Sequence, residues 1–173
     1  MPNLHSTQAS RLLAAALFLP AAVFGCNGKQ VDNATIDASD AATSSLLFEQ
    51  ATQGFPTCDM GDLFVDEYTQ TPSSPYLQTI ENYRCDTSDT LVTYCIDEQF
   101  QGLAVTRLAV PRTTFPVFAL YLAADLEMAR STLMAKLGKD FRESPASQLG
   151  AAPELVQDPE DASASVLICT KPD

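Results

Sequence analysis

Residues 91–110 read LVTYCIDEQFQGLAVTRLAV, and this stretch decides the fold predicted for the chain. Apolar and polar side chains alternate along its first half, which is the period of a half-buried strand. Gln101-Gly102 then supplies turn residues before a second apolar run. The stretch therefore predicts two antiparallel strands, residues 91–100 and 103–110. On the first strand, one face carries Val92, Tyr94 and Ile96, and the other carries Thr93, Cys95 and Asp97.

Shorter apolar runs on both sides extend the predicted sheet. Residues 76–85 precede the hairpin across the turn-rich sequence DTSDT, so we expect them to pair with the strand at 91–100. Residues 117–122, VFALYL, predict a fourth strand, although so short an apolar run also fits a helix. Residues 165–170, SVLICT, predict a final strand that inserts into the sheet.

The clearest helix is predicted at residues 126–137, where apolar residues recur at steps of three and four. Asp125 can cap its first turn, and Gly138 can adopt the left-handed conformation that ends it. The stripe expected to face the core consists of Leu126, Ala129, Leu133, Met134 and Leu137.

The other segments predict less regular structure. Residues 46–54 fit a short helix ended by Gly54 and Pro56, and residues 140–161 fit a connection with at most one short strand near Phe141. Short connections within the sheet favour an α+β domain. We expect an antiparallel sheet of about five strands with one amphipathic helix packed on one face.

The N-terminal stretch, residues 11–26, reads RLLAAALFLPAAVFGC and has the order of an export signal: a basic residue, an apolar run and a small-residue cleavage site. Its apolar run of about 20 Å as a helix is short of the roughly 30 Å hydrocarbon core, which argues against an uncleaved membrane anchor. Val23, Phe24, Gly25 and Cys26 resemble the lipobox of bacterial lipoprotein signal peptides.

This resemblance implies cleavage before Cys26, a diacylglycerol on its sulfur and acylation, for example with palmitate, of the new amine. Two or three acyl chains anchor a protein stably in a bilayer. Ordinary signal cleavage after Gly25 is the alternative, but it leaves an odd number of cysteines in an exported chain. By the same resemblance, Asn27 in place of Asp favours the outer membrane.

Three segments are therefore predicted: a signal peptide at 1–25, a lipidated flexible tether at 26–45 and a single disulfide-tied domain at 46–173. The tether is expected because its polar, Ala- and Ser-rich sequence cannot bury enough apolar area to offset its ordering entropy. Nine basic and 22 acidic residues follow residue 25, which gives that part of the chain a net charge of −13. So acidic a chain is repelled by nucleic acid.

Cysteine parity supports two disulfides in an oxidising compartment, because lipid on Cys26 leaves four cysteines. We favour Cys85–Cys95 with Cys58–Cys169. The first bond would flank a hairpin, and an even turn puts its two cysteines on opposite faces unless a bulge intervenes. Cys95–Cys169 with Cys58–Cys85 stays open as the alternative. Without a Cys-x-x-Cys motif, a zinc or redox-active site is not expected.

Catalytic motifs are scarce. Beyond residue 25 the sequence has no histidine, which excludes Ser-His-Asp triads and histidine metal sites, and it has no phosphate-loop pattern. We expect neither an enzyme nor a cofactor, and no stretch has the ligand ladder of a calcium loop. A carboxylate-based hydrolase is the alternative, since glycoside hydrolysis needs only two acids, such as Asp97 with Glu98 or two of the acids at 59–67.

The sequence therefore predicts a non-catalytic envelope lipoprotein that binds another protein. Its acidity favours a basic partner, so one form is an immunity or inhibitor protein against a basic hydrolase or toxin, although acidity also serves solubility alone. The alternative is a structural subunit of an outer-membrane or secretion assembly, recognised through an exposed sheet edge. The candidate partner-binding residues are Asp59, Asp62, Asp66 and Glu67.

Overall fold

The computed structural model describes residues 38–112, 117–139, 141 and 153–170. These residues belong to the second of two compact units of the chain, Ile36–Asp173. The predicted signal peptide, Cys26 and the first part of the predicted tether lie outside the described residues.

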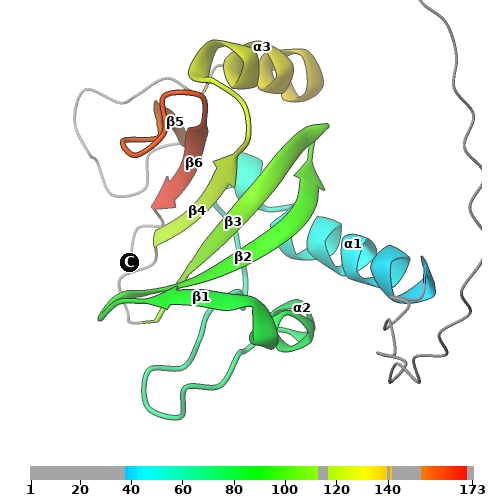
Figure 1. The fold of residues 1–173 in the computed structure, drawn as a ribbon, viewed down its shortest axis with the longest axis vertical. Helices are drawn as coiled ribbons and strands as arrows, with labels where there is room; N and C mark the ends of the chain where they lie inside the picture. Colours follow the sequence, from blue (N-terminus) through cyan, green and yellow to red (C-terminus); the bar gives the residue numbers. More distant parts are fainter. Residues whose placement is uncertain (1–37, 113–116, 140, 142–152, 171–173) are drawn as a thin grey trace, which may run out of the picture. The chain divides into compact units, whose positions relative to one another are not determined.

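An antiparallel sheet of six strands, in the order β1-β2-β3-β4-β6-β5, forms the centre of this unit (Figure 1). The mixed α+β class is confirmed, but the strand count is six rather than about five. Four of the predicted strands form within one residue of their expected bounds. The strands are β1 (Arg84–Thr87), β2 (Leu91–Phe100), β3 (Leu103–Pro111), β4 (Val117–Leu122), β5 (Glu154–Gln157) and β6 (Ser165–Thr170).

Strand β5 was not predicted. It lies at the edge of the sheet and pairs with β6. Its sequence, ELVQ, is too short to show an alternation of apolar and polar residues, and only Leu155 of the four is buried. This is why the sequence pattern did not predict the strand. Of the short strand considered near Phe141, only Phe141 itself lies within the described residues, and it is not part of a strand. Phe141 is instead a buried core residue whose carbonyl accepts a hydrogen bond from the Leu155 amide at 3.1 Å.

The strand predicted at residues 76–85 is also wrong for most of its length. The segment holds the helix α2 (Pro75–Thr79) and the 3-10 helix η2 (Glu81–Tyr83), and β1 begins only at Arg84. Ser74 caps α2, because its Oγ accepts a hydrogen bond from the Leu77 amide at 3.2 Å, and Pro75 suits the first helical turn. A local cap thus overrides the apolar pattern that favoured a strand.

The first helix, α1 (Ala38–Thr52), begins within the predicted tether and includes most of the short helix predicted at 46–54. The polar composition suggested no tertiary partner for this segment. Ser44 and Ser45 nevertheless donate hydrogen bonds to the two carboxylate oxygens of Glu98 in β2, at 2.9 and 3.0 Å. These contacts, with the burial of Phe48, dock α1 on the sheet.

Helix α3 (Leu126–Leu137) has the predicted bounds and caps. Asp125 accepts a hydrogen bond from the Met128 amide at 2.9 Å, and Gly138 is left-handed with φ 66°. Ala129 and Leu133 are buried, whereas Met134, predicted to face the core, is 43% exposed. None of the helices in the described residues has both the length and the apolar character needed to span a membrane.

The two faces of the sheet differ in what they carry. On the core face, sheet residues form one large apolar cluster with Phe48 of α1, Leu77 of α2 and Leu133 of α3. Three helices therefore contribute to the core, where one was expected, and α1 runs behind β2 and β3 in Figure 1. The opposite, outer face has a smaller cluster of Ala109, Ala119 and Val166, against which Tyr121, Val156 and Ile168 pack.

Both favoured disulfides are present. Cys58 and Cys169 join the segment after the 3-10 helix η1 (Phe55–Thr57) to β6, with their Cα atoms 5.2 Å apart. Cys85 and Cys95 join β1 to β2, with their Cα atoms 5.7 Å apart. A bulge between Arg84 and Asp86 shifts the register at Cys85, which is the irregularity that this second bond requires.

Candidate functional site

An exposed loop with many internal hydrogen bonds spans residues 61–73 and is here called the Tyr68 loop. Its two arms are joined by the bridge between Val65 and Pro72, and the Asp66 amide donates to the Thr71 carbonyl at 2.9 Å. The Val65 amide also donates to the carbonyl of Pro111 at the end of β3, at 3.0 Å. The loop is thus closed on itself and anchored to the sheet.

Asp66 organises the tip of the loop. Its Oδ1 accepts hydrogen bonds from the amides of Tyr68 and Thr69, at 3.0 and 2.7 Å, and from the Thr69 hydroxyl at 2.9 Å. The bonds from Thr69, followed by that from Tyr68, lower the pKa of the Asp66 carboxyl below its ordinary value. Its charge is therefore directed into the loop, where it fixes the backbone on both sides of Tyr68.

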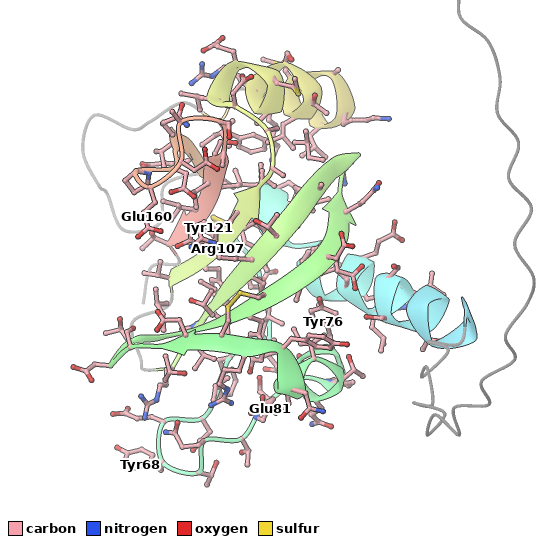
Figure 2. All side chains as sticks on the ribbon, in the orientation of Figure 1. Tyr68, Tyr76, Glu81, Arg107, Tyr121 and Glu160 are labelled. Atoms are coloured by element: carbon pink, nitrogen blue, oxygen red, sulfur yellow. A yellow bond between two sulfur atoms is a disulfide. The ribbon has the colours of Figure 1, made fainter. Side chains whose placement is uncertain are left out.

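Tyr68 is the most exposed large apolar side chain among the described residues, at 90% exposure, and it stands at the far end of the loop in Figure 2. Phe64, on the first arm, is 39% exposed. Glu67 precedes Tyr68 and is exposed, with no ion pair to another described residue. A hydrogen-bonded loop thus presents an aromatic ring beside a carboxylate.

The four acidic residues predicted to bind a partner do not form one cluster. Asp59 and Asp62 are exposed and line an open hollow of about 310 Å³ between the end of α1 and the start of the Tyr68 loop. Asp66 is engaged within the loop, and Glu67 lies beside its tip. Sequence reasoning missed Tyr68, because an aromatic residue in a polar stretch does not reveal from sequence whether it is buried.

The predicted carboxylate pair of Asp97 and Glu98 does not converge. Asp97 is exposed, whereas Glu98 is 9% exposed and lies under α1. The buried Tyr76 hydroxyl has no hydrogen-bond partner among the described residues. Burial raises its pKa, and the negative charge of Glu98 acts in the same direction. This arrangement fits docking of α1 and α2 better than hydrolysis, which needs two acids facing one substrate.

A second polar cluster, on the outer face, was also missed. The guanidinium of Arg107 lies 3.9 Å from the centre of the Tyr121 ring (Figure 2). It also lies 2.9 Å from the carboxylate of Asp158, which is buried. Glu160 lies farther away, at 3.6 Å. Arg107 and Asp158 are 51 residues apart in sequence, so no local pattern joins them. The ion pair holds the connection between β5 and β6 against the sheet.

Within the described residues, no group of three or more His, Cys, Asp or Glu side chains is placed to hold a metal ion. No protein-family model, no curated protein and no solved structure matches this chain. The exposed ring and carboxylate of the Tyr68 loop are therefore the features that bear on function.

Proposed function

We propose that this chain is a non-catalytic lipoprotein of the bacterial cell envelope that binds another protein through the Tyr68 loop. The observation that carries this proposal is the 90% exposure of Tyr68 at the tip of a loop fixed by hydrogen bonds. Exposing a large aromatic ring to water has no benefit for folding, whereas tyrosine is enriched among the residues that dominate protein–protein binding.

The hydrogen bonds within the loop support the same proposal. Binding costs free energy when a flexible loop must be ordered, and a loop that is already ordered avoids that cost. Asp66, Thr69 and Thr71 already form the hydrogen bonds that hold the tip. The tip therefore suits insertion into a pocket of a partner without rearrangement.

The charge of the chain indicates the kind of partner. Glu67 lies beside Tyr68, Asp59 and Asp62 lie at the base of the loop, and the chain after residue 25 has a net charge of −13. This field would attract a basic protein and accelerate its association. An immunity or inhibitor protein that holds a basic hydrolase or toxin fits both the exposed ring and the acidic surroundings.

The proposed location rests on Cys26 and Asn27, which resemble the lipidation site of outer-membrane lipoproteins. Intact-mass analysis of native protein should show a chain that begins at Cys26 and carries acyl groups. An unmodified sulfur at position 26 would contradict the anchoring but not the binding.

The binding site is tested with the full, lipidated chain in detergent as bait for envelope proteins. We expect capture of a basic protein that is lost as salt rises. Once the partner is purified, Tyr68→Ala should weaken its affinity by about 30-fold, as expected of a dominant interface residue. Glu67→Gln should lower the association rate at low salt and have little effect at high salt.

Tyr83→Ala is the matched control, because Tyr83 is 57% exposed but lies on η2, outside the loop. It should bind as the unmodified chain does. Equal binding by the Tyr68→Ala and unmodified chains, or a partner retained equally at high salt, would contradict the proposed site.

A second candidate is a structural subunit of an envelope assembly, recognised through a sheet edge. The observation in its favour is β1, an edge strand of four residues without a buried side chain. Co-fractionation in a large complex that resists high salt and the Tyr68→Ala substitution would favour this candidate.

A further inference from the structure

The two disulfides differ in accessibility. Cys58 and Cys169 are 6% and 0% exposed, and both belong to the core cluster. Cys85 and Cys95 are both exposed, at the edge of the sheet. Two residues share the outer face of β2 with Cys95: Thr93 is half-buried, and Asp97 is exposed. A thiol reagent can therefore approach Cys85–Cys95 from the outer face without unfolding the core.

The disulfide is also an important constraint on β1. No β1 side chain is buried, and the pairing with β2 is interrupted by the bulge at Cys85. Two other contacts hold the ends of the strand. Arg84 lies 5.9 Å from the centre of the Tyr94 ring, and Arg112 donates to the Ser88 carbonyl at 3.0 Å. Between these contacts, the described residues hold β1 through backbone pairing with β2 and through the bond from Cys85 to Cys95.

We propose that Cys85–Cys95 is a site of thiol–disulfide exchange. The reductant that acts on it is a dithiol, such as a protein with a Cys-x-x-Cys motif. A thiolate of the reductant attacks one of the two sulfurs, which breaks the Cys85–Cys95 bond and forms a mixed disulfide. The second thiolate of the reductant then attacks the mixed disulfide. Cys85 and Cys95 leave as thiols with two protons and two electrons gained, and the reductant leaves as its disulfide.

The consequence is a change at one edge of the sheet. Once the bond is broken, β1 separates more easily from β2 and exposes the backbone groups of Val92, Thr93 and Tyr94, which are paired with β1 in the oxidised chain. An unpaired edge of this kind is a template for addition of a strand from another chain. This inference is independent of the Tyr68 loop and goes beyond the proposed function.

The test is stepwise reduction of the oxidised chain with dithiothreitol at neutral pH, followed by alkylation and peptide mass mapping. We expect Cys85 and Cys95 to be alkylated while Cys58–Cys169 remains intact. A thioredoxin-type protein dithiol used at catalytic concentration with an excess of dithiothreitol should accelerate the same step. Alkylation of Cys58 and Cys169 first, or of all four cysteines together, would overturn the proposal.

Hydrogen exchange measures the structural consequence. In the selectively reduced chain, amides of β1 and of residues 92–94 should exchange at least about tenfold faster, while those of β4 and β6 keep their protection. The Cys85→Ser/Cys95→Ser variant should reproduce this pattern without any reductant, and it serves as the control for reagent effects. Unchanged exchange in both the reduced chain and the variant would overturn the opening of the edge.

Discussion

The core and outer faces of the sheet are built from the same strands by different means. Leu167 and Val166 are neighbours in β6, yet Leu167 belongs to the large cluster under the helices and Val166 to the small one on the outer face. The core face relies on many large buried side chains and on Cys58–Cys169. The outer face relies on small side chains and on Arg107 paired with Asp158. We therefore expect stability to depend far more on the core face.

The largest expected loss follows removal of the core disulfide. Cys58–Cys169 closes a separation of 111 residues, and a loop of that length should stabilise the fold by about 5 kcal/mol through the entropy of the unfolded chain. Urea unfolding of Cys58→Ala/Cys169→Ala measures the change in the free energy of unfolding. Cys85→Ala/Cys95→Ala is the matched control. Its separation is only 10 residues, which gives about 3 kcal/mol in the same treatment. An equal or larger loss in this control would contradict the expected order of the two disulfides.

The next comparison uses the two neighbours in β6. Leu167→Ala should cost about 2–5 kcal/mol, because it leaves a cavity among fully buried side chains. Val166→Ala removes less apolar volume and should cost about 1.5 kcal/mol. Urea unfolding measures both free energies, and the dependence on urea concentration should be the same for the two variants. Similar values per methylene removed would show that the outer face is packed as tightly as the core.

The outer-face ion pair should contribute less. Arg107→Ala leaves the buried Asp158 carboxylate without its cation, but the Arg107 side chain is itself 32% exposed, so water can enter. We expect a loss of about 1–2 kcal/mol. Glu160→Gln is the control, since Glu160 is 78% exposed and 3.6 Å from the guanidinium, and its loss should stay below about 0.5 kcal/mol. Thermal or urea unfolding measures the loss of stability in both variants. Equal losses would mean that the ion pair of Arg107 and Asp158 contributes no more than an exposed one.

The smallest effect at neutral pH concerns Tyr94, a buried core-face residue. Burial raises its pKa from 10.0 to about 12, and its hydrogen bond to Glu81 acts in the same direction. Because the neutral phenol is favoured in the folded state, the contribution of Tyr94 to the free energy of unfolding is complete below pH 10. It is lost as the pH rises from 10 towards 12. Tyr94→Phe should reduce the alkaline loss of stability, measured by unfolding at pH 8 to 12. An unchanged alkaline profile would mean that Tyr94 is hydrated in the folded chain.

Sequence periodicity predicted the parts of the fold in which local pattern and burial agree. Strand β2 and helix α3 have the expected bounds, and Gln101 and Gly102 form the hairpin turn with φ 55° and 86°. The errors arise where a local or long-range contact decides the structure. Ser74 caps α2 in a segment expected to be a strand, and Glu98 binds the first half of α1, which was expected to be part of a tether.

The candidate site was predictable only in part. An acidic surface near residues 59–67 followed from composition, but the internal role of Asp66 depends on the fold of its loop. The exposure of Tyr68 and the pairing of Arg107 with Asp158 depend on which segments meet in space. A sequence pattern carries no signal for either. Tyr68 and the buried Tyr76 both lie near apolar residues and near Thr, Ser and Pro, so their sequence surroundings do not separate the exposed ring from the buried one.

The position of β6 also bears on when the chain can fold. This strand is the last in sequence among the described residues, yet it lies between β4 and β5, and its Cys169 is bonded to Cys58. During synthesis, β4 therefore lacks one neighbour until residues 165–170 have been added. A nascent chain without them has an incomplete sheet and lacks the bond from Cys58 to Cys169, so the core can close only when almost all of the described residues have been made.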